Sequence, residues 1–203
     1  MTKRRYTLGK RASSQEDTRQ RIVEATVQLH QEVGPRETTI SAIAEKAQVQ
    51  RLTVYRHFPD EEALFAACTT HWFETNPPPS FSTWNEEKRQ ARIVAALYQL
   101  YSYYRRTERM FTLSYRDEPY ILALHQPMNQ FRSYLDSIRD DLIKHVRPKR
   151  SVAEEVRMTL GHAVQFSTWQ SLAAHDADDK QIPLLVCAWL EGILNSTTMP
   201  PPH

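Results

Sequence analysis

The fold is decided by residues 38–64, which read TTISAIAEKAQVQRLTVYRHFPDEEAL. Thr39 has the chemistry of a helix N-cap, and apolar residues follow it at helical spacing at Ile40, Ile43, Ala44 and Ala47. Only Gln48 and Val49 separate this short helix from a second one, predicted from Gln50 to Phe58. Two short helices joined by so tight a turn indicate a helix-turn-helix unit.

The second short helix carries side chains suited to reading DNA. Val54 and Phe58 are four residues apart, so both can face a core. The residues that then face outward are Gln50, Arg51, Thr53, Tyr55, Arg56 and His57. Arginine pairs with guanine, glutamine with adenine, and hydroxyls with phosphates or base edges, in the major groove where such a helix lies. An ordinary amphipathic surface helix would have a similar composition, so chemistry alone leaves both interpretations open.

The pattern of residues 38–64 resembles the N-terminal domain of the tetracycline-repressor (TetR) family, and the predicted helix upstream also fits. The ending Tyr55-Arg56-His57-Phe58 and the apolar approach to it occur in that family's register. The resemblance implies an all-α homodimer. It also implies an N-terminal three-helix helix-turn-helix domain, followed by a larger helical domain for ligand binding and dimerisation.

The resemblance further implies which residues contact DNA. The position of Thr39 commonly meets the backbone, and that of Ser41 lies near the bases. Recognition-helix contacts fall at Gln50, Arg51, Thr53, Tyr55 and His57, with Arg56 as a further basic candidate.

Three positions depart from the family pattern. Gln48 replaces a turn glycine, so it is expected in the left-handed conformation. Leu52 replaces a small residue and would bring an apolar side chain near the groove, while Glu61 replaces a phosphate-binding lysine.

The rest of the chain is also expected to be helical. Residues 1–12 are interpreted as a disordered basic arm, and a capping-box pattern, Ser13 with Glu16, predicts a helix that ends at Gly34 and Pro35. Asp60 is expected to cap the next helix, and three prolines at 77–79 mark the clearest break. Further helices are predicted over 85–106, 108–115, 118–146, 151–175 and 179–195. The predicted domains are residues 1–60, the basic arm and helix-turn-helix, and residues 61–203, the ligand-binding and dimerisation domain.

Charge and composition fit this interpretation. Residues 1–57 carry eleven Lys or Arg against six Asp or Glu, a net charge of +5 in a chain of net +2. A basic N-terminal part favours a polyanionic partner, with a solvated charged tail as the alternative. Cys68 and Cys187 lie in apolar patterns typical of core residues in a reducing compartment. No metal-ligand, nucleophile-elbow or phosphate-loop motif occurs in the sequence, so we expect no enzyme, no metal and no cofactor.

The second half of the chain is rich in aromatic residues. Some of these are predicted to line an apolar effector site, with ordinary core packing as the alternative. The candidates are Tyr101, Tyr104, Phe111, Tyr115, Phe131, Phe166 and Trp169. A dimer interface is predicted on the helices of 151–175 and 179–195. Its candidates, which could equally be core residues, are Val156, Leu160, Val164, Leu185, Trp189 and Ile193.

The sequence therefore predicts a cytoplasmic, nucleoid-associated transcription regulator without membrane contact. It would be a homodimeric repressor on a pseudo-palindromic double-stranded DNA operator, released by a small apolar or aromatic effector. Activation of transcription is the alternative to repression. A helix-turn-helix adaptor that responds to a protein partner is the main alternative function, and an all-α enzyme is a second.

Overall fold

Helices occupy almost all of the described chain, which confirms the predicted all-α fold class. The computed structural model describes residues 3–86, 88–175 and 178–196, with side chains from Ser13 onward, and no strand occurs among them. With four glycines in 203 residues, little in the sequence interrupts helices. None of the helices in these ranges has the length and apolar character needed to cross a membrane.

The chain packs into two compact units. The N-terminal unit comprises Met1–Pro77 and Arg109–Met128, and the C-terminal unit comprises Pro78–Glu108 and Asn129–His203. Two long helices, α5 (Arg89–Asp117) and α6 (Leu122–Val146), therefore contribute residues to both units. These units describe packing, and the functional division into 1–60 and 61–203 stays a prediction.

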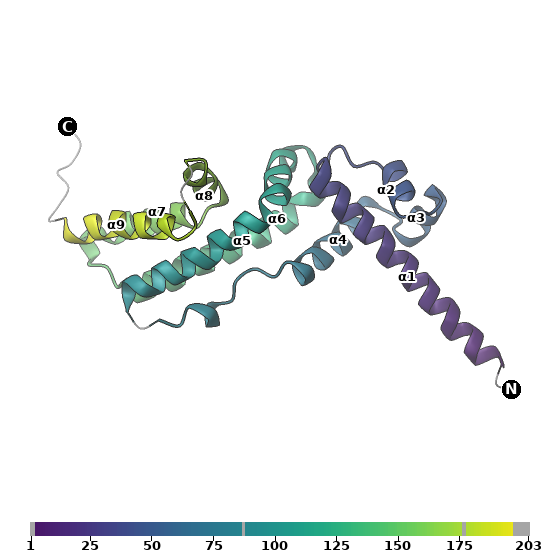
Figure 1. Cartoon of the computed structure of the whole chain (residues 1–203), viewed down its shortest axis with the longest axis horizontal. Helices are drawn as coiled ribbons and strands as arrows, with labels where there is room; N and C mark the ends of the chain where they lie inside the picture. The colour runs from purple at the N-terminus through teal and green to yellow at the C-terminus, as the bar shows by residue number, and fades with distance from the viewer. Residues whose placement is uncertain (1–2, 87, 176–177, 197–203) are drawn as a thin grey trace. The chain divides into compact units, whose positions relative to one another are not determined.

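The N-terminal unit is built on α1, which contacts both α2 and α4, while α2 contacts α3 (Figure 1). Its helices are α1 (Lys3–Glu32), α2 (Ile40–Lys46), α3 (Arg51–His57) and α4 (Glu61–Thr75), together with the end of α5, the 3-10 turn η2 (Glu118–Tyr120) and the start of α6. Ile22, Val54, Leu64, Cys68 and Trp72 are buried in its core. Cys68 is thus a free core cysteine, as predicted, and so is Cys187 in the other unit.

The first helix begins earlier than predicted. The backbone of residues 3–12 is helical, so both the disordered arm and the start at Ser13 were wrong for these residues, while residues 1 and 2 lie outside the described range. This segment is rich in good helix formers and has no proline, and the single Gly9 costs only about 1 kcal/mol in a helix.

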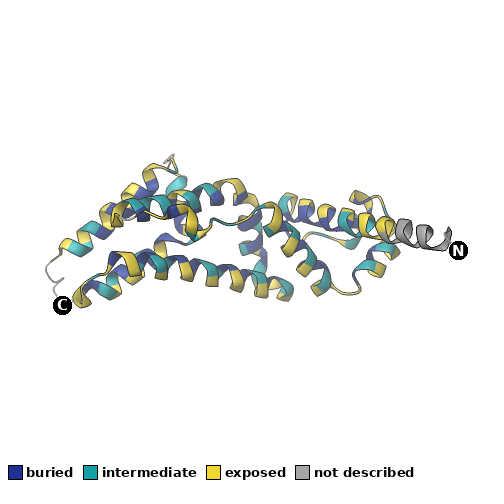
Figure 2. Cartoon of the chain, turned by 90° about the horizontal axis from the view of Figure 1, so that it is seen from below, coloured by how far each residue is buried: buried dark blue, intermediate teal, exposed yellow. Residues whose placement is uncertain are grey.

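The C-terminal unit contains the first part of α5, the later part of α6 and a group of shorter helices. These are η1 (Phe81–Trp84), η3 (Arg150–Val152), α7 (Ala153–Ala163), α8 (Phe166–Ala173) and α9 (Gln181–Asn195). The buried Arg92 of α5 joins three of these segments. Its guanidinium lies 2.9 Å from the Asp141 carboxylate on α6 and donates to the Trp84 carbonyl at 3.0 Å. Figure 2 shows the alternation of buried and exposed residues along these helices.

Two predictions about helix boundaries were wrong. The helices predicted over 85–106 and 108–115 are one helix, α5, in which Thr107 is a buried helical residue whose hydroxyl donates to the Tyr103 carbonyl. The helix predicted over 151–175 is two, α7 and α8. The break is stabilised by two tyrosine hydroxyls of α5, which donate to the carbonyls of Ala163 and Val164 at 2.8 and 2.6 Å.

Candidate nucleic-acid interface

The turn between α2 and α3 is a Schellman motif. The Val49 N–H donates to the Ala44 carbonyl at 2.9 Å, and the Gln48 N–H donates to the Glu45 carbonyl at 3.0 Å. This geometry needs a left-handed residue after the helix, and Gln48 has φ of 55°. The prediction for Gln48 is therefore confirmed, and a glutamine adopts the conformation that glycine adopts at lower cost.

Helices α2 and α4 begin at the residues that the sequence predicted. The Thr39 hydroxyl accepts from the Ala42 N–H at 3.1 Å, and the Asp60 carboxylate accepts from the Ala63 N–H at 2.7 Å, so both predicted N-caps are confirmed. Thr39 keeps its hydroxyl proton available as a donor. Its side chain is exposed, so the cap and a phosphate contact are compatible.

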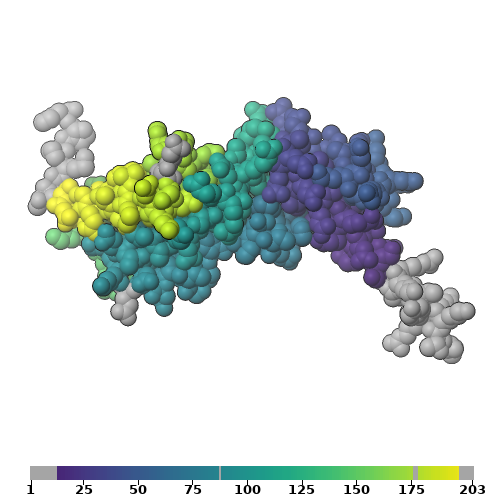
Figure 3. Space-filling model, in the orientation of Figure 1, coloured from purple at the N-terminus to yellow at the C-terminus, as the bar shows by residue number. Residues whose placement is uncertain are grey.

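The recognition helix α3 packs as predicted. Val54 and Phe58 are buried against the core, and the Arg19 guanidinium of α1 lies over the Phe58 ring at 5.0 Å. The other residues of α3 and the start of α2, which contacts α3, are largely exposed, and this part of the chain is blue in Figure 3. Its exposed members are Thr39, Ser41, Gln50, Arg51, Leu52, Tyr55 and Arg56, and Thr53 is half-buried. The structure thus brings the predicted DNA-binding residues to one surface.

His57 differs from the other candidates. Its Nε2 is buried and has no hydrogen-bond partner among the described residues. Burial, with Arg56 and Arg19 nearby, lowers the pKa of His57, so the imidazole is neutral at pH 7. A contact from this residue would use the other edge of the ring and add no charge.

A buried carboxylate that sequence reasoning missed fixes the loop leading into α2. Asp117, at the end of α5, accepts from the Arg36 backbone N–H at 3.0 Å and from the Arg116 guanidinium at 2.7 Å. Burial opposes ionisation of Asp117, but these hydrogen bonds hold its pKa below the ordinary value. Arg116 also donates to the Val33 carbonyl at 2.9 Å. No local pattern could reveal this arrangement, because the loop and Asp117 are about eighty residues apart in the chain.

Glycine is required in that loop. Gly34 has φ of +97°, and an added Cβ would lie 2.5 Å from the Asp117 carboxylate and clash with the Arg116 guanidinium as well. Gly34 therefore follows the end of α1, and its lack of a side chain leaves space for the Arg116–Asp117 ion pair of α5.

The effector candidates fall into two groups. Five rings form one buried cluster in the C-terminal unit, in which Phe166 lies 5.4 Å from Tyr104 and 5.6 Å from Trp169 between ring centroids. Its members are Tyr101, Tyr104, Phe131, Phe166 and Trp169. Phe111 and Tyr115 instead pack on each other in the N-terminal unit, with centroids 6.3 Å apart. Their role in binding an effector stays a prediction.

The dimer candidates also divide. Val156, Leu160 and Val164 are fully buried within the C-terminal unit, so for them the core alternative is correct. Leu185 and Trp189 are exposed on α9, and Ile193 is half-buried. The same unit exposes two large apolar residues that the sequence analysis did not single out, Met158 on α7 and Leu184 on α9.

Comparison with known proteins supports the helix-turn-helix assignment. Residues 22–68 match the family model of bacterial regulatory proteins, tetR family. The predicted resemblance is therefore confirmed for the N-terminal segment, which includes α2 and α3. No curated protein matches the chain in sequence.

Solved structures share the fold. A TetR-like transcriptional regulator from Rhodococcus sp. is similar with a TM-score of 0.61 at 18% identity, over 88% of this chain and 97% of that one. A tetR-family regulator from Streptomyces coelicolor has a TM-score of 0.60 at 16% identity, over 88% and 80%. FadR from Bacillus subtilis, in complex with stearoyl-CoA, has a TM-score of 0.50 at 18% identity, over 87% and 97%. At these identities the likeness shows the fold.

The left-handed Gln48 gives a stability prediction. Changing Gln48→Val should lower the free energy of unfolding by about 1–2 kcal/mol, because a β-branched side chain fits this conformation poorly. Gln48→Gly should keep or raise it. Gln50→Val is the matched control, since Gln50 is equally exposed and has φ of −78°. Equal losses for the two valine variants in urea unfolding would contradict the assignment of strain.

Proposed function

We propose that this protein is a homodimeric repressor that binds a pseudo-palindromic DNA operator through α3 and is released by a small apolar effector. The observation that carries the proposal is the exposed surface of α2 and α3, which gathers the DNA-binding candidates around Arg51, Tyr55 and Arg56. The proposed direct contacts are Thr39, Ser41, Gln50, Arg51, Thr53, Tyr55, Arg56 and His57. The site of action would be the nucleoid in the cytoplasm.

Two substitutions in the family pattern adapt the surface. Leu52 is 77% exposed, so an apolar side chain stands where it could meet a thymine methyl group. Glu61 is exposed in the first turn of α4 and would repel a phosphate there. We infer that this protein anchors to the backbone through the Thr39 side and the basic residues of α3 instead.

The coupling between effector and operator would run through α5. Residues 89–108 of this helix belong to the C-terminal unit, and residues 109–117 belong to the N-terminal unit. Within the N-terminal unit, Arg109 donates to the Gln31 carbonyl, and Arg116 and Asp117 hold the loop before α2. A shift of α5 would therefore act on the last turn of α1 and on the entry to α2. The effector can drive such a shift only through a difference in its affinity for the two states.

Binding to DNA should be specific and depend strongly on salt. Selection from a random duplex library should yield a two-fold symmetric site, and Arg51→Ala should weaken binding to it by about 1–3 kcal/mol. Arg150→Ala is the control, because it removes an equally exposed charge from the C-terminal unit. Fluorescence anisotropy measures both variants. Equal binding to selected and scrambled duplexes would refute the proposal.

Dimerisation is assigned to the exposed apolar face of α9, with Met158 of α7 as a neighbouring candidate. Trp189→Arg should give a monomer with lost operator affinity, because it places a charge in an apolar interface and separates the two DNA-binding heads. Ser137→Arg, an exposed position on α6, should leave a dimer. Light scattering at micromolar concentration distinguishes these outcomes. A wild-type monomer, or a dimeric Trp189→Arg, would exclude this interface.

The effector would bind within the aromatic cluster of the C-terminal unit. Apolar burial and stacking on Phe131, Phe166 and Trp169 would supply most of the affinity. One structural relative, FadR, is in complex with stearoyl-CoA, which carries an apolar acyl chain on a charged coenzyme A group. The proposed wall comprises the five clustered residues, because Phe111 and Tyr115 belong to the other compact unit.

Neutral aromatic compounds test the effector proposal. A compound that binds should raise the melting temperature by mass action and lower operator affinity. Phe166→Leu should weaken this response, whereas Phe111→Leu, which alters an equally buried ring of the N-terminal unit, should not. The proposed location would be wrong if Phe166→Leu left the response of an active compound unchanged.

The close packing of the aromatic cluster favours a second candidate function. Its rings are almost fully buried, and the hydroxyls of Tyr101 and Tyr104 are bonded to backbone carbonyls. A helix-turn-helix adaptor that senses a protein partner would need such a filled core and no effector. Operator binding that no small molecule changes, but that a bound protein does, would identify this alternative.

A further inference from the structure

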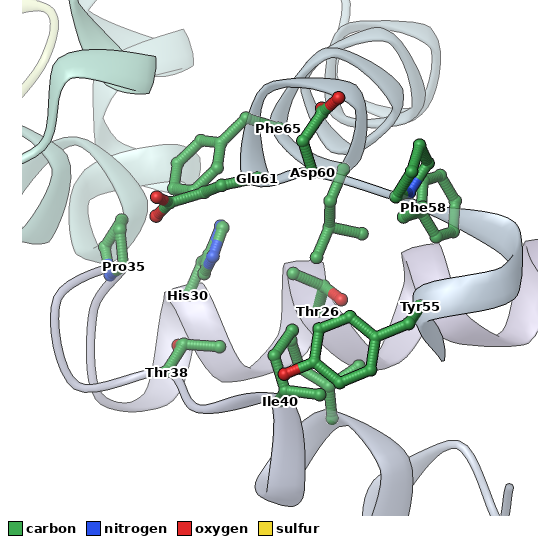
Figure 4. Close-up of a pocket in the computed structure, with 13 residues that line it drawn as sticks. Thr26, His30, Pro35, Thr38, Ile40, Tyr55, Phe58, Asp60, Glu61 and Phe65 are labelled. Atoms are coloured by element: carbon green, nitrogen blue, oxygen red, sulfur yellow. The ribbon is translucent and has the colours of Figure 1, made fainter. Parts of the chain in front are cut away.

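The N-terminal unit contains a pocket that the proposed function does not use. It has a volume of about 230 Å³ and lies between α1, the loop after it, α2, α3 and the start of α4 (Figure 4). The connection between α3 and α4 also contributes to the lining, so residues from six segments form the pocket, which is why no local sequence pattern indicated it. Its size suits a ligand smaller than the drug-sized molecules that fill about 300–1,000 Å³.

A buried histidine forms the inner wall of this pocket. His30 of α1 is 6% exposed, and its ring lies 5.0 Å from that of Phe65. Burial lowers its pKa to about 4 despite the nearby Asp117, so the ring is neutral at pH 7. Among the described residues nothing hydrogen-bonds to it, although a neutral imidazole has one donor and one acceptor. Its ring nitrogens are not among the fully buried polar atoms that lack a partner, so they are accessible from the pocket and can bond to a ligand there.

The rim of the pocket carries negative charge. Glu61 extends from the start of α4 over the side where His30 and Pro35 lie (Figure 4). Within the described ranges Glu61 takes part in no salt bridge, whereas the neighbouring Asp60 carboxylate caps α4. The lining includes no lysine or arginine among the described residues. The charge complement of this rim is therefore a cation.

The remaining wall is apolar and aromatic. Tyr55, Phe58 and Phe65 present rings to the pocket, and Leu64 adds an aliphatic surface. Aromatic rings stabilise both an apolar body and a cationic group placed over their faces. A ligand with an ammonium group at one end and a flat hydrocarbon body at the other matches this distribution.

We propose that the pocket binds a small organic cation of the arylalkylamine class, with its ammonium group at the Glu61 carboxylate and the His30 ring and its aromatic body against Tyr55 and Phe65. The site lies within the DNA-binding domain itself and is separate from the effector site proposed in the C-terminal unit. Because Tyr55 is also a candidate DNA contact, an occupant would alter the surface of α3. That regulatory consequence rests on the proposed function, whereas binding of the amine does not.

Calorimetric titration of the full chain with phenethylamine, without DNA, tests the proposal. Binding should saturate at one amine per subunit. Replacing the ammonium by a hydroxyl, as in 2-phenylethanol, should weaken binding by about tenfold or more, because a charge-assisted hydrogen bond is lost. The anion phenylacetate should bind still more weakly.

Two matched variants locate the site. Glu61→Gln should weaken phenethylamine binding by about tenfold or more, because it removes the carboxylate charge and keeps the side-chain size. Glu62→Gln should not, since Glu62 is the adjacent exposed residue of α4 and lies outside the pocket lining. Both positions are exposed, so neither variant should disturb folding.

The opposite results overturn the proposal. Phenethylamine that does not bind at millimolar concentration, or that binds no better than phenylacetate, excludes a cation site. Equal affinity for the wild type and Glu61→Gln places any binding elsewhere, and loss of binding in Phe166→Leu would assign it to the C-terminal unit. Because no DNA is present, these outcomes are independent of whether the operator proposal holds.

Discussion

The helix-turn-helix depends on one buried carboxylate. An ionised carboxyl group that is almost fully buried needs charged or polar partners, and Asp117 has both in the Arg116 guanidinium and the Arg36 backbone N–H. These partners lie in the loop between α1 and α2 and at the end of α5. Satisfying this charge therefore ties the loop between α1 and α2 to the end of α5. Gly34 is required in that loop, because a side chain there would occupy the space of the ion pair.

The turn after α2 shows how the family framework tolerates a local penalty. Two backbone hydrogen bonds and the burial of Val54 and Phe58 determine the geometry of the turn, and Gln48 conforms to it. Tertiary packing thus overrides the conformational preference of one residue. The inner face of α3 is buried against the core and its outer face is exposed, so the side chains available for contact with DNA are those of the outer face.

Polar groups are also satisfied by distant residues in the C-terminal unit. The break between α7 and α8 leaves carbonyls without helical partners, and tyrosine hydroxyls of α5 bond to them. The aromatic cluster therefore has a structural role whether or not an effector binds to it. Arg92 has a similar role, since one buried guanidinium joins η1, α5 and α6.

The sequence alone determined the features that depend on local patterns. Helical spacing and the caps at Thr39 and Asp60 follow from residues that are close in the chain, whereas the left-handed turn at Gln48 was implied by the family resemblance, and all are confirmed. It failed at the break after α7, where distant tyrosine hydroxyls bond to the freed carbonyls. Only the tertiary structure could bring Asp117 to the loop before α2, or His30 and Glu61 to one pocket. Desolvation and charge pairing act through space, so the residues that share a buried site carry no mark of it in their spacing along the chain.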